Sequence, residues 1–369
     1  MSRHKHRRIL APSPLPAPSF PPSGFARRAL VWSGRLLLVL YFAAGSLILV
    51  GRHFLMPQLV GQQALVEARL TDAIGLPVTL SGLSAEWPGL HPRLALQGLQ
   101  IHDRDGRPAL RLEHVEAEIG WSSLLVFGLR LHRLEIVAPQ LDIRRDAAGT
   151  IFIAGLPLAG SGDGGFADWL LGQGRIVVRD ATVTWHDELR GAPPFSLARL
   201  NFELRNFGRH HSFGFSAEPP AAAAARLDLR GNLVGSDIAD PGDWEGDLYA
   251  DLRAADLAAW QAWLDLPLEW SSGRGDVRLW LTVADRGFTG LTAELQLADV
   301  VMKLRPDLPE LALSRLAGRL DGRREGDGYT AASRRLTLAT SDGIVLPPTD
   351  ARLRLVPAGR KAGGEFAAN

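Results

Sequence analysis

Apolar residues form one long run near the start of the chain, from Leu30 to Val50, and further on they alternate with polar residues. At ~1.5 Å rise per residue, a helix over this run matches the ~30 Å hydrocarbon core of a bilayer. Arg35 lies near the N-terminal end, so its guanidinium can extend to the head groups. The run continues past the small residues 43–45, unlike a cleaved signal peptide. It predicts an uncleaved transmembrane helix whose anchor residues include Leu30, Leu36, Leu40, Ile48 and Val50.

The segment before this run is basic and rich in proline. It contains no acidic residue, and its basic residues are Arg3, Lys5, Arg7, Arg8, Arg27 and Arg28. Basic flanks of a transmembrane helix stay on the cytoplasmic side, and a segment of this composition cannot bury enough apolar surface to fold. We therefore expect a disordered cytoplasmic tail, with the remainder of the chain across the membrane.

From Val78 onward the apolar period changes to two, which is typical of β-strands with one buried face. The phase slips by one residue after Gly98, which predicts a β-bulge there. Few helices are expected. One short amphipathic helix follows the anchor and another covers 255–264, with Asp256 as its N-cap. The apolar face is represented by Leu94, Leu96, Ile101, Leu110, Leu112, Leu131, Ile136, Val183, Phe202, Leu227, Leu229, Leu233, Leu279, Leu281 and Leu295.

These elements predict a mainly β protein, in which an N-terminal transmembrane helix precedes a curved antiparallel β-sheet with a few short helices; the resemblance given below implies that this sheet is a curved antiparallel β-groove. Alternation alone leaves two arrangements open. The apolar faces pack on each other in a sandwich or barrel, or the sheet forms a trough whose apolar inside is left for acyl chains. The expected segments are the tail 1–28, the transmembrane helix 29–52, an amphipathic connecting helix 53–76, a first β-groove segment 77–154, a glycine-rich loop 155–165, a second β-groove segment 166–356 and a disordered tail 357–369.

Composition narrows the function classes. The 41 basic and 40 acidic residues are spread along the chain, so no broad positive field for nucleic acid is expected. The absence of cysteine excludes disulfides, thiolate zinc sites and a cysteine nucleophile. The His-Asp and His-His pairs at residues 102, 186 and 210 lack the spacing of metal ligands, and 186–188 reads as an exposed hairpin end. We expect no enzyme, no cofactor and no metal site.

Several motifs, in order along the chain, resemble those of the YhdP-type proteins of the AsmA-like superfamily. They are Gly75-Leu76-Pro77-Val78, Ser84-Ala85-Glu86-Trp87-Pro88-Gly89-Leu90, Ser122-Ser123-Leu124-Leu125, Pro139-Gln140-Leu141-Asp142-Ile143-Arg144-Arg145, Asp168-Trp169-Leu170-Leu171-Gly172-Gln173-Gly174-Arg175-Ile176, Trp185-His186-Asp187-Glu188-Leu189-Arg190-Gly191-Ala192-Pro193-Pro194 and Leu227-Asp228-Leu229-Arg230-Gly231. The resemblance runs from the anchor to about residue 355. Family members are much longer, so we expect this chain to be the N-terminal portion of a longer protein.

The resemblance implies a protein of the cell inner membrane, with one transmembrane pass and the bulk of the chain in the periplasm. It implies a repeating β-groove that carries phospholipid towards the outer membrane, and it supplies no catalytic residues. The expected partners are phospholipid, the inner membrane and a protein of the periplasm or outer membrane. The alternative is a tethered scaffold for outer-membrane biogenesis with a sealed β core; a hydrolase is disfavoured because no nucleophile with a base is evident.

Overall fold

The computed structural model describes residues 24–56, 58, 61–102, 106, 108–121, 123, 129–157, 172–235, 243–264, 268–305, 307–326, 328–355 and 365–368. The chain divides into two units, Met1–Leu55 and Met56–Asn369. The glycine-rich segment expected at 155–165 and the short helical turn expected near Ser122 lie largely outside the described residues. The same holds for most of the N-terminal tail.

The first unit is a single long helix. Helix α1 (Gly24–Val50) continues into the π-helical turn η1 (Gly51–Leu55). The helical segment Arg27–Phe54 is long and apolar enough to cross a membrane, and its side chains are almost entirely exposed within the protein. The helix therefore begins five residues before the expected boundary at 29, because no residue between Gly24 and Arg28 breaks it.

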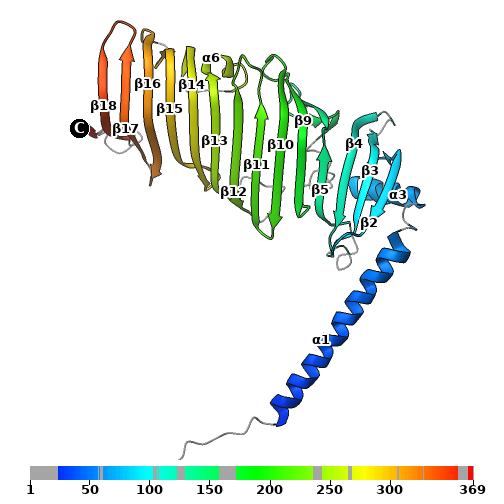
Figure 1. The fold of residues 1–369 in the computed structure, drawn as a ribbon. Coiled ribbons are helices and arrows are strands. Elements are labelled where there is room, and N and C mark those ends of the chain that lie inside the picture. Colours follow the sequence, from blue (N-terminus) through cyan, green and yellow to red (C-terminus); the bar gives the residue numbers. More distant parts are fainter. Residues whose placement is uncertain are drawn as a thin grey trace, which may run out of the picture. The chain divides into compact units, whose positions relative to one another are not determined.

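The second unit is one β-sheet with two helices (Figure 1). The helices among its described residues are α3 (Gln63–Ile74) and the short α6 (Leu257–Trp260). The strands are β1 (Val78–Thr79), β2 (Gly82–Glu86), β3 (Arg93–His102), β4 (Pro108–Ile119), β5 (Leu131–Val137), β6 (Gln140–Arg145), β7 (Ile151–Ile153), β8 (Leu156–Pro157), β9 (Arg175–Asp187), β10 (Phe195–Phe207), β11 (His210–Glu218), β12 (Arg226–Val234), β13 (Glu245–Asp256), β14 (Glu269–Ala284), β15 (Gly287–Lys303), β16 (Leu311–Glu325), β17 (Gly328–Thr340), β18 (Val345–Leu355) and β19 (Glu365–Ala368).

Most strands pair antiparallel with their neighbours in sequence. From β9 to β19 each described strand pairs with the next one. Two places differ: β1 pairs with β3, and at β9 both β5 and β6 pair with the same edge of that strand in the parallel direction. No described strand pair closes the sheet into a barrel. The prediction of a mainly β protein with a large open sheet and few helices is confirmed.

Several long strands contain a β-bulge at a residue with positive φ that is not glycine. Asp180, Ala254 and Arg335 have φ of 52°, 48° and 50°. The N–H of each donates to a side-chain oxygen on the next strand, namely Oδ1 of Asn201 at 3.3 Å, Asp276 at 2.9 Å and Asp350 at 2.7 Å. The bulge moves the apolar face by one position, because an extra residue reverses the alternation. Thus β9 turns Ile176 and Val178 inward before the bulge, and Ala181 and Val183 after it.

Four expected boundaries differ from the structure. The expected connecting helix 53–76 is split into η1 and α3. The helix expected at 255–264 is only α6, although Asp256 does cap it by accepting from the N–H of Ala259 at 3.2 Å. Strand β13 was not expected as a strand, and β19 lies within the segment 357–369 that was expected to be a disordered tail. For β13 and β19, pairing with a neighbouring strand decides the outcome where local propensity is weak.

Candidate functional site

One face of the sheet is apolar over ten strands, from β9 to β18. The pairing register places apolar or small residues opposite one another in adjacent cross-strand rows. Row one is Val178, Phe202, Phe215, Leu229, Ala250, Leu279, Ala293, Leu320, Ser333 and Ala351. Row two is Ile176, Leu204, Phe213, Gly231, Leu248, Leu281, Leu291, Gly322, Ala331 and Leu353, and row three is Ala217, Leu227, Leu252, Val277, Leu295 and Gly318. We refer to these three rows as the apolar strip.

The apolar strip is large compared with a single lipid. With ~4.8 Å between strands, ten strands span about 43 Å, and three rows at ~3.3 Å per residue span about 13 Å. One acyl layer of a bilayer is about 15 Å thick. The strip therefore offers room for more than one acyl chain.

Much of the apolar strip is only half-buried. Leu291 is 42% exposed and Leu320 is 38% exposed, although both lie in register with other apolar side chains. Phe202, Leu229, Leu233, Leu279, Leu281 and Leu295, which the sequence predicted for the apolar face, are all half-buried. Val183 and Leu227 are buried, the latter in a cluster with Trp260 of α6.

The predicted residues of the first strands have different surroundings. Helix α3 lies on this part of the sheet, and its Leu70 and Ile74 belong to one buried cluster with strands β1–β5. Protein therefore fills the apolar face here. The cluster includes the predicted residues Leu94, Leu96, Ile101, Leu110, Leu112 and Leu131, and Ile136 packs against it.

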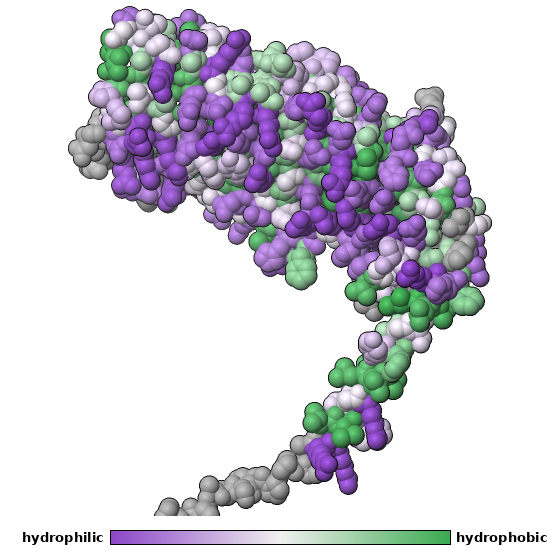
Figure 2. Space-filling view, in the orientation of Figure 1, coloured by the Kyte–Doolittle hydropathy of each residue, from purple (hydrophilic) through white to green (hydrophobic). Residues whose placement is uncertain are grey.

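The opposite face of the sheet carries a row of ion pairs that connect neighbouring strands. Asp251 and Arg278 pair at 3.6 Å, Arg278 and Glu294 at 3.6 Å, and Glu294 and Arg319 at 3.4 Å, each across one strand boundary. Asp321 continues this row of ion pairs to Arg334. Figure 2 shows a mainly hydrophilic surface over the sheet. The apolar strip thus has no equivalent on the other face of these strands, which leaves it as the candidate site.

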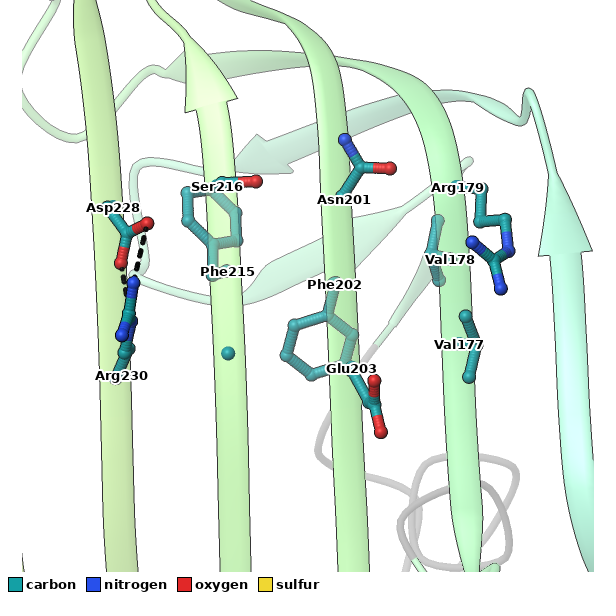
Figure 3. A pocket seen from close by; sticks show the side chains of 11 residues that line it. Val177, Val178, Arg179, Asn201, Phe202, Glu203, Phe215, Ser216, Asp228 and Arg230 are labelled. Carbon is teal, nitrogen blue, oxygen red and sulfur yellow. Dashed lines mark hydrogen bonds and ion pairs between the residues drawn. The ribbon is translucent and has the colours of Figure 1, made fainter.

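A shallow pocket of about 240 Å³ lies on strands β9–β12 (Figure 3). Its polar lining includes Arg179, Asn201, Ser216, Asp228 and Arg230. Arg230 donates to Asp228 at 2.9 Å, and this hydrogen bond raises the pKa of the guanidinium. The guanidinium of Arg230 and the carboxylate of Asp228 are therefore paired with each other in this pocket.

The pair His186-Asp187 is part of a structural contact. Asp187 accepts from Nε of Arg145 at 2.9 Å, accepts a second bond from Nη2 of Arg145, and accepts from the N–H of Arg190 at 3.2 Å. Its side chain is only 2% exposed, so the expectation of an exposed hairpin end is wrong for Asp187. No group of three potential metal ligands occurs among the described residues.

This contact predicts a pH-dependent stability. The hydrogen bond from Arg145 lowers the pKa of Asp187 below 3.8, against the opposing effect of burial. A carboxyl with a lowered folded-state pKa stabilises the protein above its unfolded pKa and loses that contribution as the pH falls through the folded value. We expect Asp187→Asn to cost about 2 kcal/mol at pH 7.

Thermal unfolding at pH 7 and pH 3, followed by circular dichroism, measures this effect. The difference between Asp187→Asn and the unmodified chain should shrink at pH 3. The control is Asp142→Asn, whose side chain is 80% exposed and lies 3.8 Å from His186. A loss of equal size at both pH values would contradict the assignment.

A helix long and apolar enough to span a membrane once is consistent with a single-pass anchor, and it precedes a long open β-sheet with one apolar face. The chain belongs to the YhdP family, because the family model described as YhdP protein matches residues 25–369. Membership suggests a membrane-associated role related to lipid transport. No curated protein and no solved structure matches the chain significantly.

The sequence missed two parts of this site. Leu248, Ala250 and Leu252 of β13 lie in the apolar strip, and their alternation was visible but weakened by the intervening Tyr249. Arg324 lies on the same face as the strip, at the end of β16. Nothing in the local sequence distinguishes it from Arg323 beside it, since only the register shows which of the two faces inward.

Proposed function

We propose that this protein is anchored in the inner membrane and transfers phospholipid through the periplasm towards the outer membrane, with acyl chains lying on the apolar strip. The observation that supports this most is the continuity of the strip across ten paired strands, with half-exposed leucines along it. Each CH₂ group removed from water contributes about 0.8 kcal/mol, so acyl chains gain free energy anywhere along the strip.

The proposal also covers the orientation of the protein in the membrane, its compartment and its binding partners. The basic segment before α1 favours a cytoplasmic N-terminus, and the sheet then lies in the periplasm. The protein acts without covalent chemistry. Its partners are phospholipid, the inner membrane and a protein of the periplasm or outer membrane.

One observation favours a second candidate function. Under α3 the apolar face is filled by protein, since Ile101 is 2% exposed and Val115 is also 2% exposed. If partners covered the apolar strip in the same way, the protein would be a tethered scaffold for outer-membrane biogenesis. The two candidates differ in what touches the strip.

Photo-crosslinking of the full chain in its membrane separates them. A photoreactive residue at Leu279, in row one, should capture phospholipid, and native mass spectrometry of the detergent-extracted chain should detect phospholipid bound to it. The control position is Trp280, the next residue, which faces the opposite side. Exclusive capture of protein from Leu279, with a lipid-free extracted chain, would overturn the proposed function in favour of the scaffold.

A further inference from the structure

The two long edges of the apolar strip differ. At one edge, α6 lies at the ends of β13 and β14 (Figure 1), and it packs in one buried cluster with Phe195 and with the turn before β12. Trp260, Phe195 and Ala223 are 7%, 7% and 0% exposed. The ring of Trp263 lies 4.6 Å from that of Phe195. Its Nε1–H donates to the carbonyl oxygen of Pro193 at 2.9 Å, which ties the turn after α6 to the β9–β10 loop. We call this edge the covered rim.

The other edge consists of the hairpin ends β10–β11, β14–β15 and β16–β17, and we call it the open rim. Phe288 is 65% exposed and Tyr329 is 54% exposed at its hairpin ends. Leu291 of the apolar strip, next to this rim, is 42% exposed. No described helix covers this edge. Apolar chains on the strip would therefore meet water at the open rim and protein at the covered rim.

Arg324 lies at the open rim on the same face as the apolar strip. It comes two positions after Gly322 and four after Leu320 on β16, so strand alternation turns all three to one face. In register it pairs with Tyr329. On this face of the described strands β10–β17, no other position is occupied by Arg, Lys, Asp or Glu. Arg324 is exposed and has no hydrogen bond or ion pair within the described part of the chain.

We propose that Arg324 binds the phosphate of a phospholipid whose acyl chains lie on the apolar strip, so that lipid head groups line the open rim. This inference rests on the proposed function. A guanidinium presents two parallel N–H donors that match the oxygens of a phosphate. Tyr329, opposite it, has an apolar ring and a polar hydroxyl, which suits the boundary between acyl chains and water. At the covered rim, by contrast, the exposed Arg274 is paired with Asp256 at 3.0 Å.

The competing explanation is that Arg324 keeps the sheet soluble, because inward-pointing charges near strand ends hinder aggregation. A role in solubility requires a charge at residue 324 but no contact with lipid. The experiment below therefore distinguishes it from phosphate binding.

The experiment compares Arg324→Gln with Arg323→Gln in the full chain. Arg323 is the adjacent residue, is also exposed and faces the opposite side. Native mass spectrometry of chains extracted from membranes and exchanged with phosphatidylglycerol measures the bound lipid. We expect an affinity about 10-fold lower for Arg324→Gln, and no change for Arg323→Gln. Equal retention by both variants, or aggregation of Arg324→Gln without loss of bound lipid, would overturn the assignment.

A second readout separates this inference from the function on which it rests. Photoreactive residues are placed at Tyr329 on the open rim and at Leu311, at the other end of β16. The photoreactive residue at Tyr329 should capture the head group of a phospholipid. Capture at Leu311 instead would overturn the head-group assignment and leave lipid transfer intact. If a photoreactive residue at Leu279 also captures no phospholipid, the proposed function itself fails.

Discussion

Leu320→Glu is expected to lower the affinity of the apolar strip for phospholipid about 100-fold, and to block movement of lipid past this position. Leu320 lies in row one between Ala293 and Ser333, so the new carboxylate would stand among the acyl chains. An acidic or basic residue within a lipid environment costs about 3 kcal/mol, which corresponds to this factor. The fold should tolerate the change, because Leu320 is already 38% exposed. Transfer of fluorescent phospholipid between vesicles by the purified chain, together with bound lipid per chain, measures the effect.

The matched control is Ala298→Glu on the neighbouring strand β15. Ala298 is exposed on the opposite face and lies in register with Arg274 and Arg315, so the carboxylate would find basic neighbours there. It should leave bound lipid unchanged. If the two variants bound equal amounts of lipid, the apolar strip would not be the surface that carries it.

Gly275→Ala should destabilise the sheet by about 3 kcal/mol or more. Gly275 has a φ of +153°, and a Cβ there would lie 1.9 Å from the backbone carbonyl oxygen of Gln296 on the paired strand. A backbone oxygen cannot rotate away as a side chain can, so strands β14 and β15 would have to separate locally. Thermal unfolding and the yield of soluble chain report the loss.

Gly290→Ala tests whether that loss is specific to the position. Gly290 is in the same pair of strands, but the nearest atoms to a Cβ there belong to the Thr282 side chain at 3.4 Å, an ordinary contact distance. We expect a much smaller change in melting temperature. Similar losses at both positions would mean that reduced backbone freedom of glycine, and not the close approach of β14 and β15, controls stability here.

The strands of this sheet were largely predictable because their side chains alternate. Leu227, Leu229 and Leu233 do lie on one face of β12, as their spacing predicts. The bulges were less accessible to prediction. Asp180, Ala254 and Arg335 share no residue type, and the oxygen that holds each bulge lies on another strand. That oxygen can be recognised only once the register is known.

The candidate site was predictable as a face but not as a surface open to solvent. Leu96 and Leu229 have the same alternating pattern, yet Leu96 is 3% exposed under α3 and Leu229 is half-buried on the apolar strip. Period two shows which side of a strand is apolar, and it does not show what lies on that side. The decisive information is the position of α3, which depends on contacts such as that of Gln63 with the carbonyl oxygen of Leu80 at 2.7 Å.

The nearest-neighbour pairing from β9 onward makes the length of this protein adjustable by evolution. Duplication or deletion of one whole hairpin there would change the reach of the sheet by about 10 Å without altering which side chains face inward. A single added strand would instead reverse the direction of every strand that follows. The parallel junction of β5 and β6 with β9 has no such freedom, since both partners depend on one edge of the same strand. Length variants among relatives should therefore differ by even numbers of strands, inserted after β9.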